Sequence, residues 1–144
     1  MQILKEPEVL RVKILVENEH GFAKSLKIEL TSDTEIYFNF IFECNDWEFK
    51  RIKANQNFFI EFREYPDFIV KNFERLAQSE NYVASFTIYS ETEGKLDLIR
   101  KSEFKDDTIM EFEFTRAPEE QIKKSIQYRY DMMRNEFKQY RARY

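Results

Sequence analysis

Few residues in this chain have the types and spacing that catalysis or metal binding requires. The single histidine, His20, stands beside Gly21 in a predicted turn, and no set of Cys, Asp and Glu at the spacing of metal ligands surrounds it. The single cysteine, Cys44, lies at a predicted strand end, and distant His20 is its only conceivable partner for a nucleophile–base pair. We therefore expect a solvated histidine, an unreactive cysteine, and no metal or other cofactor.

Phosphate binding and acid–base catalysis are equally poorly supported. With only 2 glycines, the chain has no glycine-rich phosphate loop. Asp106-Asp107 and Glu119-Glu120 are adjacent in sequence, and adjacent residues in a strand or helix point apart. We predict a protein that is not an enzyme, the alternative being an enzyme built from dispersed Asp and Glu.

Composition and charge indicate a single folded domain with an ordinary surface. The chain has 144 residues, of which 42% are hydrophobic and 17% aromatic, with 2 Gly and 3 Pro. Its formal net charge is −4, and no run of like charge reaches five residues. Nucleic acid is therefore not expected as a partner, because that affinity rests on a basic face.

Cysteine usage and the N-terminus predict a soluble protein of the cytoplasm. One cysteine cannot form an internal disulfide, which indicates a reducing compartment. The first ten residues, MQILKEPEVL, lack the apolar core of a signal peptide, and no stretch nears the ~18 apolar residues of a membrane helix. No membrane partner is expected.

The first part of the chain predicts three strands. Residues 8–17 alternate with period two and have one uniformly apolar face, and residues 18–21 are a plausible turn into a second strand over 24–31. A third strand covers 35–43, and its second face is also fairly apolar. The predicted inward residues are Leu10, Val12, Ile14, Val16, then Leu26, Ile28, Leu30, then Ile36, Phe38, Phe40 and Phe42.

The middle of the chain changes period. Asn45 or Asp46 is a suitable cap for a helix that ends at Gln56, with Trp47, Phe49 and Ile52 as its apolar contacts. Residues 58–62 (FFIEF) predict a short strand. A second helix covers 65–79, because Pro fits the first turn of a helix.

Strands return at 81–90, 95–100 and 108–115, with a Glu93-Gly94 turn between the first two. Three strands, two helices flanked by strands, three further strands and a long final helix predict an α+β fold. The head, residues 1–117, is an antiparallel β-sandwich or half-barrel with a helical insert.

A final helix over 118–144 is longer than this small head needs, at roughly 40 Å for 1.5 Å per residue. Ile122 and Ile126 have the spacing of a helix that docks on a globular surface. Beyond them, apolar residues follow spacings of 3, 4, 3 and 4, as in a heptad. These are Tyr130, Met133, Phe137, Tyr140 and Tyr144. We predict the start of a dimerising coiled coil, the alternative being one amphipathic helix packed on the head.

One apolar residue stands where the fold needs none. Phe104 is alone among the charges of residues 100–107, in the turn between two predicted strands. Single exposed apolar residues are common, so on residue types alone we expect its ring to fold back onto the core. The alternative is insertion into a partner.

Three stretches resemble the N-terminal head of the centriolar cartwheel protein family, spindle assembly abnormal protein 6, and its shorter cartwheel-like relatives. Residues 58–76, FFIEFREYPDFIVKNFERL, resemble the family's strand, aromatic-Pro junction and helix. Residues 96–114, LDLIRKSEFKDDTIMEFEF, resemble its last hairpin, with Ser102 in place of Asn and with Phe104 and Lys105 matching. Residues 117–130, APEEQIKKSIQYRY, resemble the start of its coiled coil.

The resemblance implies an XRCC-type head that assembles with itself. Heads would pair through Phe104, with Lys105 and Ser102 beside it, entering a pocket on a neighbour for which the hairpin flanks Ile99 and Ile109 are candidates. Helices would pair in parallel, and both contacts together would build the nine-fold hub of a centriole or basal body. The implied partners are further copies of the chain and other centriolar proteins.

Two other functions fit the same predicted fold. The first is a DNA end-joining scaffold of the same superfamily, which the acidic charge and the absence of a basic tail in this sequence disfavour. The second is a domain that binds peptides or lipid headgroups at a sandwich edge, for which the sequence shows no basic or open groove.

Overall fold

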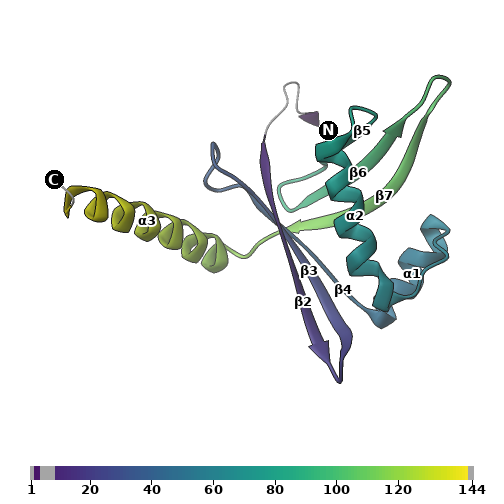
Figure 1. Cartoon of the computed structure of the whole chain (residues 1–144), viewed down its shortest axis with the longest axis horizontal. Coiled ribbons are helices and arrows are strands. Elements are labelled where there is room, and N and C mark those ends of the chain that lie inside the picture. The colour runs from purple at the N-terminus through teal and green to yellow at the C-terminus, as the bar shows by residue number, and fades with distance from the viewer. Residues whose placement is uncertain (1, 4–8, 143–144) are drawn as a thin grey trace.

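In the described residues, seven strands form one antiparallel sheet with the order β1-β5-β6-β7-β4-β3-β2 (Figure 1). The computed structural model describes residues 2–3 and 9–142, with side chains described over 9–133. The strands are β1 (Gln2–Ile3), β2 (Leu10–Glu19), β3 (Phe22–Ser32), β4 (Asn39–Asn45), β5 (Tyr82–Ile88), β6 (Glu93–Lys101) and β7 (Asp106–Arg116).

The sheet is divided into two halves that splay apart. β4 and β7 pair only at Phe40↔Arg116 and Ile41↔Thr115, so a narrow seam joins β2–β4 to the remaining strands. Helices α1 (Asp46–Gln56) and α2 (Tyr65–Gln78) cover the open side of the sheet, connected by a 3-10 turn, Phe62–Glu64 (Figure 1). The predicted half-barrel with a helical insert is confirmed.

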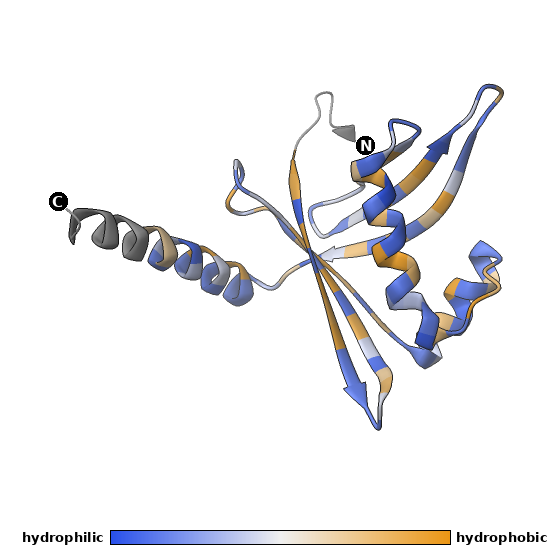
Figure 2. Cartoon of the chain, viewed as in Figure 1, coloured by the Kyte–Doolittle hydropathy of each residue, from blue (hydrophilic) through white to orange (hydrophobic). Residues whose placement is uncertain are grey.

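An aromatic core fills the space between the two halves. Phe112 is fully buried, and its ring centroid lies 5.2 Å from that of Phe42 and 6.3 Å from that of Phe114. The predicted inward residues Leu26, Ile28 and Leu30 of β3 are buried, as is Ile69 of α2. Apolar and polar bands alternate along α2, as an amphipathic helix requires (Figure 2).

Local side chains fix the ends of α1, as the sequence predicts. The Asn45 side-chain oxygen accepts a hydrogen bond from the Glu48 backbone N–H at 2.8 Å. Asn57 ends the helix in the left-handed conformation, with φ 58°, and its backbone N–H bonds the carbonyl of Lys53.

The strand predicted over residues 58–62 is wrong. The left-handed Asn57 turns the chain away from any strand, and an irregular segment follows instead. Phe58 packs on Phe68 and Tyr65, with centroids 5.5 and 6.2 Å apart, so helical side chains replace a neighbouring strand. Phe59 points outward and is 98% exposed.

Two predicted boundaries also need correction. The strand predicted from residue 35 begins at Asn39, because the Ser32 hydroxyl accepts from the N–H groups of Thr34 and Glu35 and holds a turn there. Gly94 lies within β6, and the turn falls at residues 89–92, where the Ser90 hydroxyl accepts from two backbone N–H groups.

Gly94 is required by a close contact, so Gly94→Ala is expected to destabilise the head. A Cβ at this position would overlap the ring of Phe86, which is itself held in the aromatic core. We expect a loss of about 1–3 kcal/mol in a urea titration. Gly21→Ala is the control, since nothing lies within 4 Å there and the φ of +81° alone should cost about 1–2 kcal/mol. Unchanged stability of Gly94→Ala would show that Phe86 moves aside freely.

Helix α3 (Glu119–Ala142) projects from the head, and its first turns dock on the head (Figure 1). Ile122 is buried with Ile41 and Ala117 in a second, smaller cluster, against which Ile126 packs. The Arg129 guanidinium donates to the backbone carbonyl of Ser32 at 3.0 Å. The second apolar face predicted for the strand over 35–43 is the face of β4 that carries Ile41, and helix α3 packs against it.

Candidate assembly interfaces

The tip of the β6–β7 hairpin is a fixed turn that presents one aromatic ring. Lys101 and Asp106 form the last pair of the ladder. The Ser102 N–H donates to the Lys105 carbonyl at 3.2 Å, and the Ser102 hydroxyl also bonds that carbonyl. Phe104 is 90% exposed, so its ring does not fold back onto the core of its own chain.

Ion pairs stiffen the hairpin just below this tip. The Arg100 guanidinium lies 3.0 Å from the Asp107 carboxylate, and Lys105 lies 3.7 Å from the same group. The hydrogen bond from Arg100 lowers the pKa of Asp107 below its ordinary value, so the carboxylate stays charged at neutral pH. The predicted residues Ser102, Phe104 and Lys105 thus form one connected, ordered tip.

The hairpin flanks Ile99 and Ile109 are not brought together as one pocket. The ladder shifts register between Leu98 and Ile99, so that Ile99 faces Thr108 rather than Ile109. Ile109 packs against the core, and both side chains are half-buried. Their role in receiving a partner stays a prediction.

A groove lies between α1 and β7 and contains Trp47, which was predicted to be an apolar contact of the first helix. Trp47 is 77% exposed and, with Ile52, lines a cavity of about 610 Å³. The Gln56 amide exchanges two hydrogen bonds with the backbone of Glu111, at 2.9 and 3.0 Å, and so fixes α1 against β7. The other residues of this α1–β7 groove are Phe42, Glu43, Glu48, Lys50, Arg51, Asn55, Gln56, Glu111 and Glu113.

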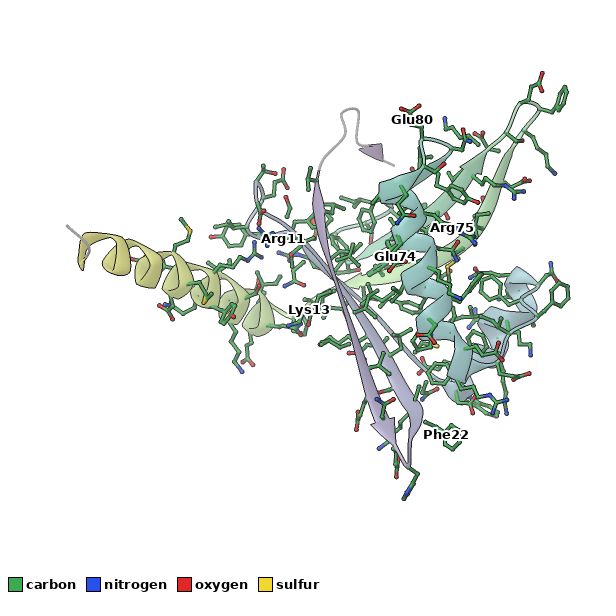
Figure 3. All side chains as sticks on the ribbon, viewed as in Figure 1. Arg11, Lys13, Phe22, Glu74, Arg75 and Glu80 are labelled. Carbon is green, nitrogen blue, oxygen red and sulfur yellow. The ribbon has the colours of Figure 1, made fainter. Side chains whose placement is uncertain are left out.

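A second groove, of about 720 Å³, lies between the β2–β3 hairpin and the start of α2. Phe22 is its most exposed aromatic residue and lies at the lower end of the head in Figure 3. Val16, Ile60 and Phe68 also line it. Neither groove could be predicted from the sequence, because each combines residues from separate elements.

The predicted coiled-coil residues lie on α3, beyond its contacts with the head. Tyr130 is 60% exposed and Met133 is 70% exposed. Phe137 and Tyr140 fall within α3, but their side chains, and all of Tyr144, lie outside the described residues. An exposed apolar stripe is what a pairing helix needs, and the pairing itself stays a prediction.

His20 and Cys44 stand apart in the structure. His20 is an exposed turn residue with φ 53°. Burial raises the pKa of the Cys44 thiol to about 12, which leaves it protonated and a poor nucleophile. Within residues 2–3 and 9–142 there is no cluster that could hold a metal ion, and no helix is long and apolar enough to cross a membrane.

Comparison with known families decides what kind of head this is. The family described as the centriolar protein SAS N-terminal domain matches residues 2–114. The chain belongs to this SAS-6 head family. Its members are structural, non-enzymatic proteins, and membership implies a structural role in the centriolar cartwheel.

Solved SAS-6 heads have the same fold as this chain. A mutant N-terminal fragment of Leishmania SAS-6 with parts of its coiled coil is similar with a TM-score of 0.75 at 18% identity, over 92% of this chain and 74% of that chain. The N-terminal coiled-coil dimer of C. elegans SAS-6 gives 0.75 at 11%, over 92% and 77%. A Drosophila melanogaster Sas-6 fragment dimerised via its coiled coil gives 0.64 at 15%, over 95% and 74%. A comparison with curated proteins finds no match.

Proposed function

We propose that this chain is the head and the first part of the stalk of a self-assembling cartwheel scaffold. Heads pair through Phe104 and stalks pair in parallel through α3, and the two contacts together set a nine-fold ring at the centriole or basal body in the cytoplasm. The observation that carries the proposal is the exposed Phe104 ring on a turn held by Ser102. The solved SAS-6 coiled-coil dimers support the pairing of the stalk.

The α1–β7 groove is the proposed receiver of Phe104. The groove and the hairpin tip lie along the same strand, because β7 runs from Asp106 at the tip to Glu111 and Glu113 in the groove wall. We call the β6–β7 hairpin with this groove the hairpin arm. When two hairpin arms pair about a two-fold axis, each tip meets the groove of the other copy, so each copy inserts its Phe104 ring into the other. The apolar Trp47 and Ile52 offer the ring a surface to cover, and four glutamates of the groove complement Lys105.

Trp47 is the only tryptophan, so it reports directly on this proposed contact. Raising the protein concentration should shift its fluorescence emission to the blue, because pairing removes the indole from water. The shift should follow the same concentration dependence as association measured by sedimentation velocity.

Two variants distinguish the two grooves. Ile52→Asp, which alters the α1–β7 groove, should suppress the shift, whereas Phe22→Ser in the groove beside α2 should leave it in place. The proposed receiver is wrong if association proceeds at full strength while the Trp47 emission stays constant, or if Phe22→Ser is the variant that suppresses association.

Pairing of the stalk is tested by truncation after Tyr128. Removing residues 129–144 deletes the predicted seam from Tyr130 onward and retains the docked Ile122 and Ile126. In a Phe104→Glu background, we expect truncation to lower the dimer fraction at concentrations where the untruncated chain still pairs. Two heptads make a weak dimer, so the measurement needs concentrations approaching millimolar. Equal dimer fractions in both chains would contradict pairing through α3.

A further inference from the structure

Strand β2 forms a long edge of the sheet. Its partner on one side is β3, and within the described residues no strand pairs with its other side. Val12, Leu15 and Val16 of this ten-residue strand are 37–40% exposed. Edges of this kind attract another strand unless they are covered or charged.

The charges on β2 are arranged so that the strand complements itself. Arg11 and Lys13 precede Leu15, and Glu17 and Glu19 follow it, all at alternate positions and therefore on one face. In an antiparallel pair of two copies centred on Leu15, each residue faces the one equally far along on the other side. Arg11 then faces Glu19 of the second copy, and Lys13 faces Glu17.

On the opposite face of β2, the same register gives an apolar Ile14–Val16 pair and places Val12 opposite Asn18. Ile14 packs on the core of its own head, and it would face Val16 of the second copy. Val12 and Val16 are only partly covered by the elements of their own chain, so a second strand would cover them further. Cross-strand apolar pairs and opposite charges are the contacts that stabilise an antiparallel ladder.

Two neighbouring registers also place the core-facing sides of both β2 strands on the same face of the joined sheet. Both registers bring fewer opposite charges together across the pair. Centring the pair on Ile14 places Lys13 opposite Leu15, and centring it on Val16 places Leu15 opposite Glu17. The register shift between β2 and β3 omits Lys24 of β3 from the pairing, so β2 itself keeps its alternation through Glu19.

Contacts within the head leave these charges available at the edge. Lys13 makes no ion pair among the described side chains, and it lies with Arg11 along β2, well away from α2 (Figure 3). Arg11 lies 2.8 Å from Asp33, and Lys24 lies 3.9 and 3.6 Å from Glu17 and Glu19, all of them exposed pairs of small energy.

We infer that the edge of β2 is a third self-association surface, through which two heads pair antiparallel about Leu15. β2 is the last strand of the sheet, and β4 and β3 separate it from the hairpin arm that carries Phe104. Helix α3 contacts Glu29 and Ser32 of β3 and contributes no strand to the edge. This contact therefore links assemblies that Phe104 and α3 have already formed, and it does not depend on either.

Charge reversal in the full chain carrying Phe104→Glu tests the surface without the proposed head contact. Lys13→Glu and Glu17→Lys should each weaken association at least tenfold, because like charges then face each other across the pair. An equimolar mixture of the two variants, and the chain carrying both changes, should recover it, because each restores opposite charges. Association that is unaffected by either single variant, or that neither the mixture nor the double change restores, would overturn the inference.

Disulfide trapping tests the register. Directly opposed residues of an antiparallel pair lie ~4.5–5.5 Å apart at Cα, within reach of a disulfide. Leu15→Cys should therefore give a covalent dimer under mild oxidation, and the buried native thiol of Cys44 should stay unreactive. Lys13→Cys is the matched control, since its two thiols would lie about 14 Å apart at ~3.4 Å per residue. Equal trapping of both variants, or none with Leu15→Cys, would contradict pairing about Leu15.

Discussion

Phe104→Glu is expected to abolish the pairing of heads through the hairpin tip while the head itself stays folded. Burying a phenylalanine side chain contributes about 1.5–3 kcal/mol, and the substituted carboxylate would have to be buried without a partner. A loss of ~3 kcal/mol or more is a weakening of more than about 100-fold. Association also costs several kcal/mol of lost freedom, so the native contact is weak, and pairing through the hairpin tip should be undetectable in the variant at every practical concentration.

The control for this variant is Phe59→Glu. Phe59 is also a loop phenylalanine and is even more exposed, at 98%, but it lies on the segment between α1 and α2 rather than on the hairpin. Sedimentation should show association weakened by Phe104→Glu and unchanged by Phe59→Glu, and both melting temperatures should stay within about 2 °C of the parent, as for surface substitutions. A Phe104→Glu head that melts many degrees lower would place Phe104 in its own core and remove its proposed role.

Phe112→Ala is expected to have the largest effect on stability. Phe112 has no exposed surface, and its ring packs against Phe42, Phe73 and Phe114 where the two halves of the sheet meet. Deleting the ring loses both the burial and the packing around the space it leaves, about 3–5 kcal/mol. That loss is a large fraction of the ~5–15 kcal/mol that stabilises a typical domain.

Phe104→Ala makes the same chemical change on the surface, so it separates stability from assembly. Urea unfolding should show a change within about 0.5 kcal/mol for Phe104→Ala, which in turn should weaken head pairing. A Phe112→Ala head as stable as its parent would mean that the core repacks around the missing ring, contrary to the close packing described above.

Alternation along the strands made most of the sheet predictable. Leu26, Ile28 and Leu30 face the core because a period of two leaves them no other arrangement once one face of β3 is covered. The ends of α1 followed from Asn45 and Asn57, whose side-chain and left-handed caps act locally. Where a few neighbouring residues determine the structure, the sequence was sufficient.

The errors fall where distant elements decide the outcome. The run at 58–62 has the residues of a strand, but the Phe58 ring packs on side chains of α2, and its backbone N–H donates to Lys53 of α1 rather than to a neighbouring strand. Trp47 has an apolar side chain on a helix, but it lies in the open groove between α1 and β7 and stays 77% exposed. Phe104 could be predicted as a contact residue because it is an apolar residue among charges and because the hairpin resembles that of the family. The grooves could not be predicted, because they depend on how α1, α2 and the sheet come together.

The seat of α3 makes the head sensitive to small angular errors. The helix has 24 residues and is held at one end by Ile41, Ala117 and Ile122. At 1.5 Å per residue it extends about 36 Å, so a tilt of about 5° at this seat displaces its far end by about 3 Å. A conservative change such as Ile41→Val, which should cost only about 0.5–1.5 kcal/mol of stability, therefore changes the direction of a long helix. In an assembly that must close on itself, such a change would be felt as curvature rather than as stability.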